Sequence, residues 1–255
     1  MNRIWNKYMT VATTSQHPYY PLDVKLSGEY VENDWSVSYL ITAFGALWTL
    51  LLGVTLVAVR RVNHRLSAKD QGLVLWFVLS TGMAVVRFNS VAAGSIHIFF
   101  EGYFIYNHAR MASMQDFFGQ LWKEYALSDS RYMSSDPFLL TIEFWTIILW
   151  GPLSYVAAIL IVKDSPFRHS VQALVSTGEF YGNLLYLLTS LLDEKLSGIS
   201  YYRPEPFYFW VYFVLMNSIW LFVPAYCLYD SVMASARSFV AARSIERGSH
   251  RKKIR

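Results

Sequence analysis

The chain has 255 residues, of which 54% are hydrophobic, 17% are aromatic and only 16% are charged. Soluble domains carry about 25% charged residues, so this composition indicates a membrane protein. The net charge of +4 is modest, and we interpret its uneven distribution as a sign of membrane topology rather than of nucleic-acid binding. The single cysteine, Cys227, excludes an internal disulfide framework and a paired-cysteine metal site.

Five apolar stretches predict membrane-spanning helices, because a helix needs about 20 apolar residues to cross a bilayer. In chain order they are Ser36–Val59, Gly72–Phe104, Phe144–Val162, Ser170–Leu192 and Pro206–Tyr229. We expect the third to begin earlier, near Pro137. The alternation typical of barrel strands is absent, and a helix satisfies its own backbone in lipid. No signal-peptide pattern precedes the first stretch, so we expect it to stay in the mature protein.

Basic residues follow the first and third stretches and fill the C-terminal tail. They are Arg60, Arg61, Arg65, Lys69, Lys163, Arg168, Arg237, Arg243, Arg247, Arg251, Lys252, Lys253 and Arg255. In a five-span arrangement all of them lie on one side, which the positive-inside rule makes cytoplasmic. The final KKIR matches a dilysine signal for retrieval to the endoplasmic reticulum. We therefore expect a lumenal segment at 1–35, a transmembrane domain at 36–234 and a basic cytoplasmic tail at 235–255.

The second stretch, Gly72–Phe104, is too long for one simple span. It contains MAVVRFNSVAAG, residues Met83–Gly94, with Arg87 in the middle. We leave open whether this segment is a loop, a kink or an extension of the helix.

Within that stretch, SIHIFFEGYF carries His97 and Glu101 four residues apart. Residues at this spacing share one helix face and can touch. Ionisable groups inside a membrane are expensive and usually functional, so the pair is a candidate catalytic site. The alternative is a purely structural hydrogen bond between helices.

Two further stretches carry polar residues at helical spacing. In the third, Glu143 shares a face with Thr146 and Trp150, although Glu143 in contact with lumenal water would also explain it. In the fifth, Asn217 and Trp220 lie one turn apart, and the alternative for Asn217 is a structural link between helices.

The fourth stretch contains Glu179 and Asn183 in TGEFYGNLLY, again four residues apart. Gly178 and Gly182 beside them have the small-xxx-small spacing that is typical of close helix packing. The sequence thus offers a second polar pair on a helix that approaches its neighbours closely.

Carboxyl groups, an imidazole and many aromatic rings in lipid favour proton transfer on a hydrophobic substrate. A carboxyl group out of water can donate a proton near neutral pH, and a second carboxylate can accept one. Ring faces and carboxylates stabilise a carbocation formed in between. No HExxH, glycine-rich phosphate loop or GxSxG motif occurs, so we expect no metal and no cofactor.

A series of motifs resembles the EXPERA family of emopamil-binding proteins. In order they are HPYYP, IHxxxEGYF, LWKEYALSDSRY, LWGPLS, YGNLLYLLT and YFWVYFVLMNSIWL. The similarity runs from His17 to Asp230. It implies a five-helix, dimeric bundle in the endoplasmic reticulum membrane, whose sterol-binding cavity opens within the bilayer. It also implies a sterol Δ8,Δ7-isomerase of sterol biosynthesis, which binds cationic amphiphilic inhibitors.

The resemblance assigns roles to individual residues. His97, Glu101, Glu143, Asn217 and Trp220 match the catalytic positions of the family. Thr146, Trp122, Tyr125 and Tyr132 match positions near the substrate, and we add Glu179 and Asn183 to this group. The His97–Glu101 pair would supply or relay a proton, and Glu143 would stabilise the cation or exchange a proton itself. Trp220 would offer its ring face, and Asn217 and Thr146 would orient the carboxylates.

Three features depart from the family pattern. Met83–Gly94 looks like an insertion before His97, either a genuine loop or retained intron sequence. Glu179 and Asn183 stand where we expect Gln and Asp. These departures keep two alternatives open: an isomerase that acts on another terpenoid in specialised metabolism, and a non-catalytic sterol-binding or trafficking protein.

Overall fold

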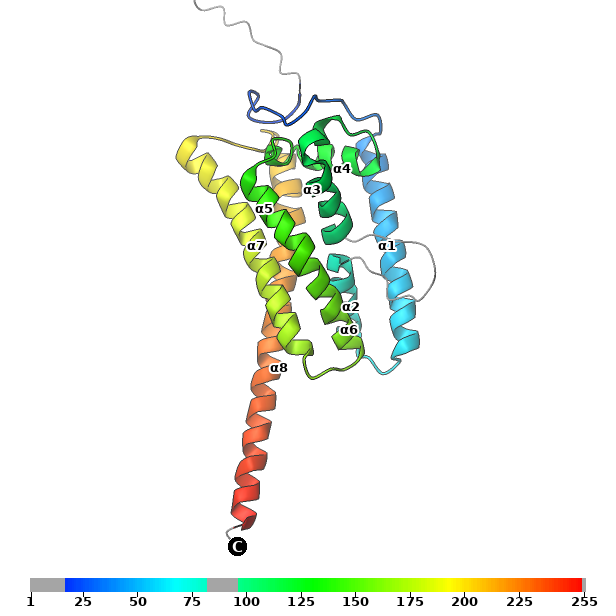
Figure 1. The fold of residues 1–255 in the computed structure, drawn as a ribbon, viewed down its shortest axis with the longest axis vertical. Coiled ribbons are helices and arrows are strands. Elements are labelled where there is room, and N and C mark those ends of the chain that lie inside the picture. The colour runs from blue at the N-terminus through cyan, green and yellow to red at the C-terminus, as the bar shows by residue number, and fades with distance from the viewer. Residues whose placement is uncertain (1–16, 82–95, 254–255) are drawn as a thin grey trace, which may run out of the picture.

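The computed structural model describes residues 17–81 and 96–253, and within those residues the regular secondary structure is all helical, with no strand (Figure 1). This confirms the predicted all-α class. The α-helices are α1 (Val37–Val62), α2 (Ala68–Thr81), α3 (Gly102–Asn107), α4 (Phe117–Tyr125), α5 (Pro137–Trp145), α6 (Gly151–Val162), α7 (Arg168–Ser197) and α8 (Met216–Lys253). Three π-helical segments, η2 (Ile96–Glu101), η5 (Thr146–Trp150) and η6 (Tyr208–Leu215), and two 3₁₀ turns, η3 (His108–Ser113) and η4 (Ser130–Tyr132), join them.

Short polar residues set the beginnings of several helices. The Ser36 side chain accepts a hydrogen bond from Tyr39 N at the start of α1. Asp116 caps α4, and Asp136 caps α5 directly before Pro137. Such caps satisfy amide groups that have no partner inside the helix. They fix where each apolar segment begins.

Helices α1, α2 and α5–α8 form the bundle, in which α7 packs along α8 and α2 along α6. The loops at 63–67 and 163–167 lie at the end from which α8 projects (Figure 1). Two ion pairs tie this end together: Lys69 with Asp230 at 2.7 Å, and Arg168 with Asp70. The basic segments that the sequence places on one side therefore share one end of the molecule.

A compact cap closes the opposite end (Figure 1). We define the cap as residues 17–35 and 108–136. A backbone hydrogen bond joins these two segments: the Val31 N–H donates to Ala112 O at 3.0 Å. The Lys123 ammonium donates to Val31 O at 2.6 Å, and the Tyr19 hydroxyl donates to Lys123 O at 3.1 Å. These bonds join segments about a hundred residues apart and fix the position of α4 over the bundle.

Three helical segments of the described chain are long and apolar enough to cross a membrane: Val37–Val62, Pro137–Val162 and Tyr208–Arg247. They coincide with the first, third and fifth predicted stretches. Pro137 is the first residue of its helix, as expected. The boundary that we placed between residues 234 and 235 falls inside α8, which continues without a break to Lys253.

The fourth stretch is one helix, α7, which is longer than predicted and ends at Ser197, where the next residue, Gly198, has φ +68°. The second stretch is divided. Helix α2 ends at Thr81, the helix resumes as η2 at Ile96, and α2 and η2 contact each other. The proposed insertion Met83–Gly94 lies outside the described residues.

Candidate functional site

A cavity of about 760 Å³ lies inside the bundle beneath the cap. This is within the roughly 300–1,000 Å³ range of small-molecule sites. Every candidate site residue named from the sequence lines it: His97, Glu101, Trp122, Tyr125, Tyr132, Glu143, Thr146, Glu179, Asn183, Asn217 and Trp220. All three π-helical segments contribute to its wall. Such segments widen a helical turn and are frequent at functional sites.

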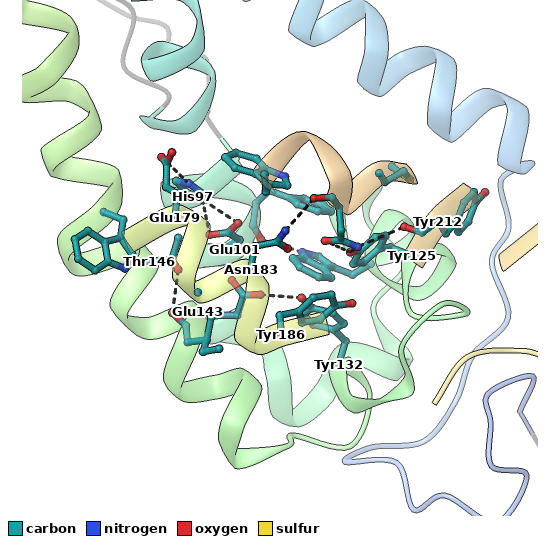
Figure 2. A pocket seen from close by; sticks show the side chains of 18 of the residues that line it. His97, Glu101, Tyr125, Tyr132, Glu143, Thr146, Glu179, Asn183, Tyr186 and Tyr212 are labelled. Atoms are coloured by element: carbon teal, nitrogen blue, oxygen red, sulfur yellow. Dashed lines mark hydrogen bonds and ion pairs between the residues drawn. The ribbon is translucent and has the colours of Figure 1, made fainter. Parts of the chain in front are cut away.

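His97 is buried between two carboxylates (Figure 2). Its Nδ1 lies 2.8 and 2.9 Å from the two carboxylate oxygens of Glu101, so the predicted contact within SIHIFFEGYF is present. Its Nε2 lies 3.7 Å from Glu179 Oε1, and that oxygen accepts a hydrogen bond from the Ser154 hydroxyl at 3.2 Å. The imidazole thus has a carboxylate on each side.

Glu143 occupies the last turn of α5 and is 6% exposed. The Tyr132 hydroxyl donates to Glu143 Oε1 at 2.8 Å, which fixes the carboxyl group against the cavity (Figure 2). Glu143 also interacts electrostatically with Glu101 and His97. Two carboxyl groups and an imidazole therefore share one wall of the cavity. Contact with lumenal water is not needed to explain why Glu143 occurs in an apolar stretch.

Asn217 links three parts of the bundle. Its side-chain amide donates to Phe213 O at 2.8 Å and to the Tyr125 hydroxyl at 3.1 Å, and Asn183 Nδ2 donates to Asn217 O at 2.9 Å. The amide contacts no carboxylate in these hydrogen bonds. Thr146 likewise donates its hydroxyl to Ile142 O at 2.9 Å. We expected both residues to orient carboxylates, but in the structure Tyr132 has that contact with Glu143.

Aromatic rings make up much of the remaining wall. The Trp220 ring lies 4.9 Å from the His97 ring, centroid to centroid. Trp122 contacts Tyr132 at 4.7 Å, and Tyr125 contacts Tyr132 at 5.6 Å. The Trp122 indole donates to Phe100 O at 2.9 Å, which satisfies its one polar atom. Aromatic rings thus share the cavity wall with the acid–base groups.

The two glycines of α7 differ. A Cβ at Gly178 would lie 2.6 Å from atoms of the Trp150 ring, so the close packing expected there is present. At Gly182 a Cβ would meet nothing within 4 Å, so the expectation of close packing is wrong at this position. Gly182 borders the cavity instead.

Several residues at the site were not predicted, and four of them bear on its chemistry or its support. Tyr186 lines the cavity three residues after Asn183, and this shared helix face was a signal that could have found it. Ser154 depends on how α6 packs on α7, which no spacing in the sequence encodes. Glu124 and Tyr212 also line the cavity, and their hydrogen bond joins segments 88 residues apart.

Within residues 17–81 and 96–253, no cluster of three or more His, Cys, Asp or Glu side chains is placed to hold a metal ion. The cavity wall instead carries side chains that can exchange protons. The carboxyls of Glu101, Glu124, Glu143 and Glu179 and the imidazole of His97 line it and can give or take a proton.

The fold and this wall define a helical protein with a buried acid–base cavity, and comparison with known proteins identifies its family. Residues 117–231 match the family model EBP: EXPERA, the expanded EBP superfamily. The 3-beta-hydroxysteroid-Delta(8),Delta(7)-isomerase of Cavia porcellus is 36% identical over 88% of this chain and 90% of that protein. The enzyme of the same name from Rattus norvegicus is 35% identical over 88% and 90%. Isomeliandiol synthase of Melia azedarach is 32% identical over 59% and 71%. The chain belongs to the EXPERA family.

Proposed function

We propose that the protein is a sterol Δ8,Δ7-isomerase, which moves the C8=C9 double bond of a sterol to C7=C8. The observation that carries this proposal is the placement of His97, Glu101 and Glu143 on the wall of one buried, mostly aromatic cavity. The relatives from Cavia porcellus and Rattus norvegicus are named isomerases, and the chain is an enzyme that isomerises a double bond. Proton exchange by these side chains is sufficient for that reaction.

The proposed reaction begins when a proton is delivered to C9, which leaves a carbocation at C8. A base then removes a proton from C7, and the electron pair of that C–H bond forms the C7=C8 double bond. The His97–Glu101 pair supplies or relays a proton, because both groups are joined by a hydrogen bond and lie at the cavity surface. Glu143 stabilises the cation or exchanges a proton itself.

The neighbours of these groups have supporting roles in the proposal. Tyr132 fixes the Glu143 carboxyl through its hydrogen bond. Trp220 presents a ring beside His97, where its negative face stabilises a cation. Trp122, Tyr125 and Tyr132 shape the wall around the sterol rings. Asn217 and Thr146 support this wall through backbone contacts rather than through the carboxylates.

We place the protein in the endoplasmic reticulum membrane with five spans. The spans are α1, α2 together with η2–α3, α5–α6, α7 and η6–α8. The cap faces the lumen and the end with Lys69 and Arg168 faces the cytoplasm, in agreement with the distribution of basic residues. Residues 1–35 are then lumenal, 36–234 span the membrane and 235–255 are the cytoplasmic extension of α8.

The same proposal includes the partners. The sterol enters from the lipid, two copies form a homodimer, and cationic amphiphiles bind in the cavity because they resemble the carbocation.

A second candidate is the isomerisation of another terpenoid. The contact of Glu179 with His97 favours it, because Glu179 stands where the family resemblance predicts Gln and adds a carboxylate to the reacting end of the cavity. A relative named isomeliandiol synthase agrees with this direction.

Product analysis tests the proposal. The chain is expressed in cells that lack their own Δ8,Δ7-isomerase, a Δ8 sterol is supplied, and the ratio of Δ7 to Δ8 sterol is measured by mass spectrometry. We expect Δ7 sterol to accumulate. Glu143→Gln and Glu101→Gln should each lower the rate by about 10²–10⁴-fold, which is typical for the loss of an acid or base. Glu246→Gln, on the exposed part of α8, is the matched control and should retain activity.

No conversion by the wild-type protein, at a normal level in the membrane, would contradict the sterol assignment. Feeding other unsaturated triterpenoids to the same cells would then test the second candidate.

A further inference from the structure

The cap end of the cavity carries a polar pair that the proposed reaction does not use. Glu124 lies on α4 and Tyr212 on η6, and both side chains line the cavity. The Tyr212 hydroxyl donates to Glu124 Oε1 at 3.0 Å. Figure 2 shows Tyr212 on the far side of the cavity from His97 and Glu179. The cavity therefore has two polar ends.

The distance between these ends follows from the helix that carries both. Tyr212 precedes Trp220 by eight residues on the continuous η6–α8 helix, which corresponds to roughly 12 Å at about 1.5 Å per residue. Trp220 contacts the His97 ring. Aromatic side chains lie between the two ends, among them Tyr125 and Tyr132, whose rings contact each other. This space matches a ligand with an apolar ring system, a polar group at one end and its reacting carbons at the other.

Glu124 keeps hydrogen-bonding capacity toward the cavity. A carboxylate accepts about four hydrogen bonds, and Tyr212 occupies only one of these sites. Burial raises the pKa of Glu124, whereas the hydrogen bond from Tyr212 and the charge of Arg203 lower it. A ligand hydroxyl can donate to the carboxylate and approach the Tyr212 oxygen at the same time.

We propose that Glu124 and Tyr212 form a hydroxyl-binding subsite, which holds the alcohol group of the substrate at the cap end and so places its distant double bond beside His97, Glu101 and Glu143. This inference rests on the proposed isomerase function and adds a requirement: the substrate is a free alcohol, not an ester or an ether. A sterol meets this requirement, because its hydroxyl is on ring A and its Δ8 bond lies between rings B and C.

The test compares two substrates in membranes that contain the full-length protein: a Δ8 sterol with a free 3β-hydroxyl and its 3-deoxy analogue. We expect the wild-type enzyme to prefer the alcohol by about ten- to hundredfold in kcat/KM, which is the usual value of one hydrogen bond to a charged group. Glu124→Ala should remove most of this preference, chiefly through KM for the alcohol, and should change turnover of the deoxy analogue far less. Tyr212→Phe should act in the same direction with a smaller effect.

A second tyrosine–glutamate pair supplies the control. The Tyr202 hydroxyl donates to Glu194 at 2.6 Å, but neither residue lines the cavity. Glu194→Ala and Tyr202→Phe should leave the ratio between the two substrates unchanged. Thermal unfolding of each variant identifies any loss of folded protein.

Two results would overturn the inference. One is a wild-type enzyme that isomerises both substrates equally well, which would leave the isomerase function standing without a hydroxyl subsite. The other is an equal loss of activity on both substrates in Glu124→Ala, which would make the pair a structural link between α4 and η6. Failure of the proposed function itself looks different, because then neither substrate is converted by the wild-type protein.

Discussion

Two buried charged clusters, one in the cap and one in the cavity, are built in opposite ways. In the cap, Arg131 donates to both carboxylate oxygens of Asp129 at 2.9 and 2.6 Å, to the Thr189 hydroxyl at 2.9 Å and to Tyr186 O at 3.2 Å. In the cavity, by contrast, His97 Nε2 and Glu179 Oε2 are buried without a hydrogen-bond partner.

Burial alone therefore does not distinguish a charged cluster that stabilises the fold from one that serves a function. A buried ion pair with every donor satisfied holds one conformation and leaves nothing for a ligand. A buried cluster with free donors and acceptors is costly to fold, and the cost is offset only where a ligand or a reaction uses those groups. Tyr186 connects the two regions, since its backbone accepts from Arg131 while its side chain lines the cavity.

The largest effect on stability should come from breaking the satisfied cluster. Asp129→Asn leaves the buried Arg131 without its counter-charge, and we expect a loss of about 3–5 kcal/mol in the free energy of unfolding. Thermal unfolding in detergent measures it. Glu143→Gln in the cavity is the matched comparison and should unfold close to the wild-type temperature. Equal unfolding temperatures for Asp129→Asn and wild type would contradict a structural role for the pair.

A smaller effect is expected where α7 approaches the cavity wall. Gly178→Ala places a methyl group 2.6 Å from the Trp150 ring, and overpacking of this kind costs about 1–3 kcal/mol. Gly182→Ala, one turn away, meets nothing within 4 Å and should leave unfolding unchanged. The same melting experiment separates the two. If both variants unfold alike, the close contact between α7 and Trp150 is not what the structure indicates.

The smallest effect should be on the support of the cavity cluster. Ser154→Ala removes the hydroxyl that donates to Glu179, a bond that contributes about 1 kcal/mol. We expect kcat to fall about fivefold, because Glu179 then holds His97 less firmly. Ser238→Ala, which removes a hydroxyl bound to the backbone of exposed α8, is the control. A kcat unchanged by Ser154→Ala would mean that Glu179 does not position His97.

Sequence periodicity was sufficient to predict part of the fold and part of the candidate site. The contact between His97 and Glu101 follows from four-residue spacing on one helix, and the apolar stretches give the long helices directly. Contacts between distant segments were not accessible in this way. The hydrogen bonds from Ser154 to Glu179, from Tyr132 to Glu143 and from Tyr212 to Glu124 all depend on packing of separate elements.

The π-helical segments also limit how well side-chain positions can be predicted from the sequence. Thr146 lies in η5, where Gly151 N–H bonds to Thr146 O across five residues, and its hydroxyl donates to Ile142 O instead of a carboxylate. A pattern based on the α-helical period does not foresee such a turn. Family resemblance, rather than periodicity, is what brought Trp122, Tyr125 and Tyr132 into the predicted site.

The most direct test of the central claim, that the cavity's side chains exchange protons with the substrate, is isomerisation in D₂O. Membranes with the wild-type protein are incubated with a Δ8 sterol, and the position of deuterium in the Δ7 product is determined by NMR and mass spectrometry. We predict one deuterium at C9, because the proton delivered there comes from a side chain equilibrated with water. A Δ7 product with only protium at C9 would contradict the account, since the hydrogen would then have moved within the sterol without passing through the exchangeable acids of the cavity.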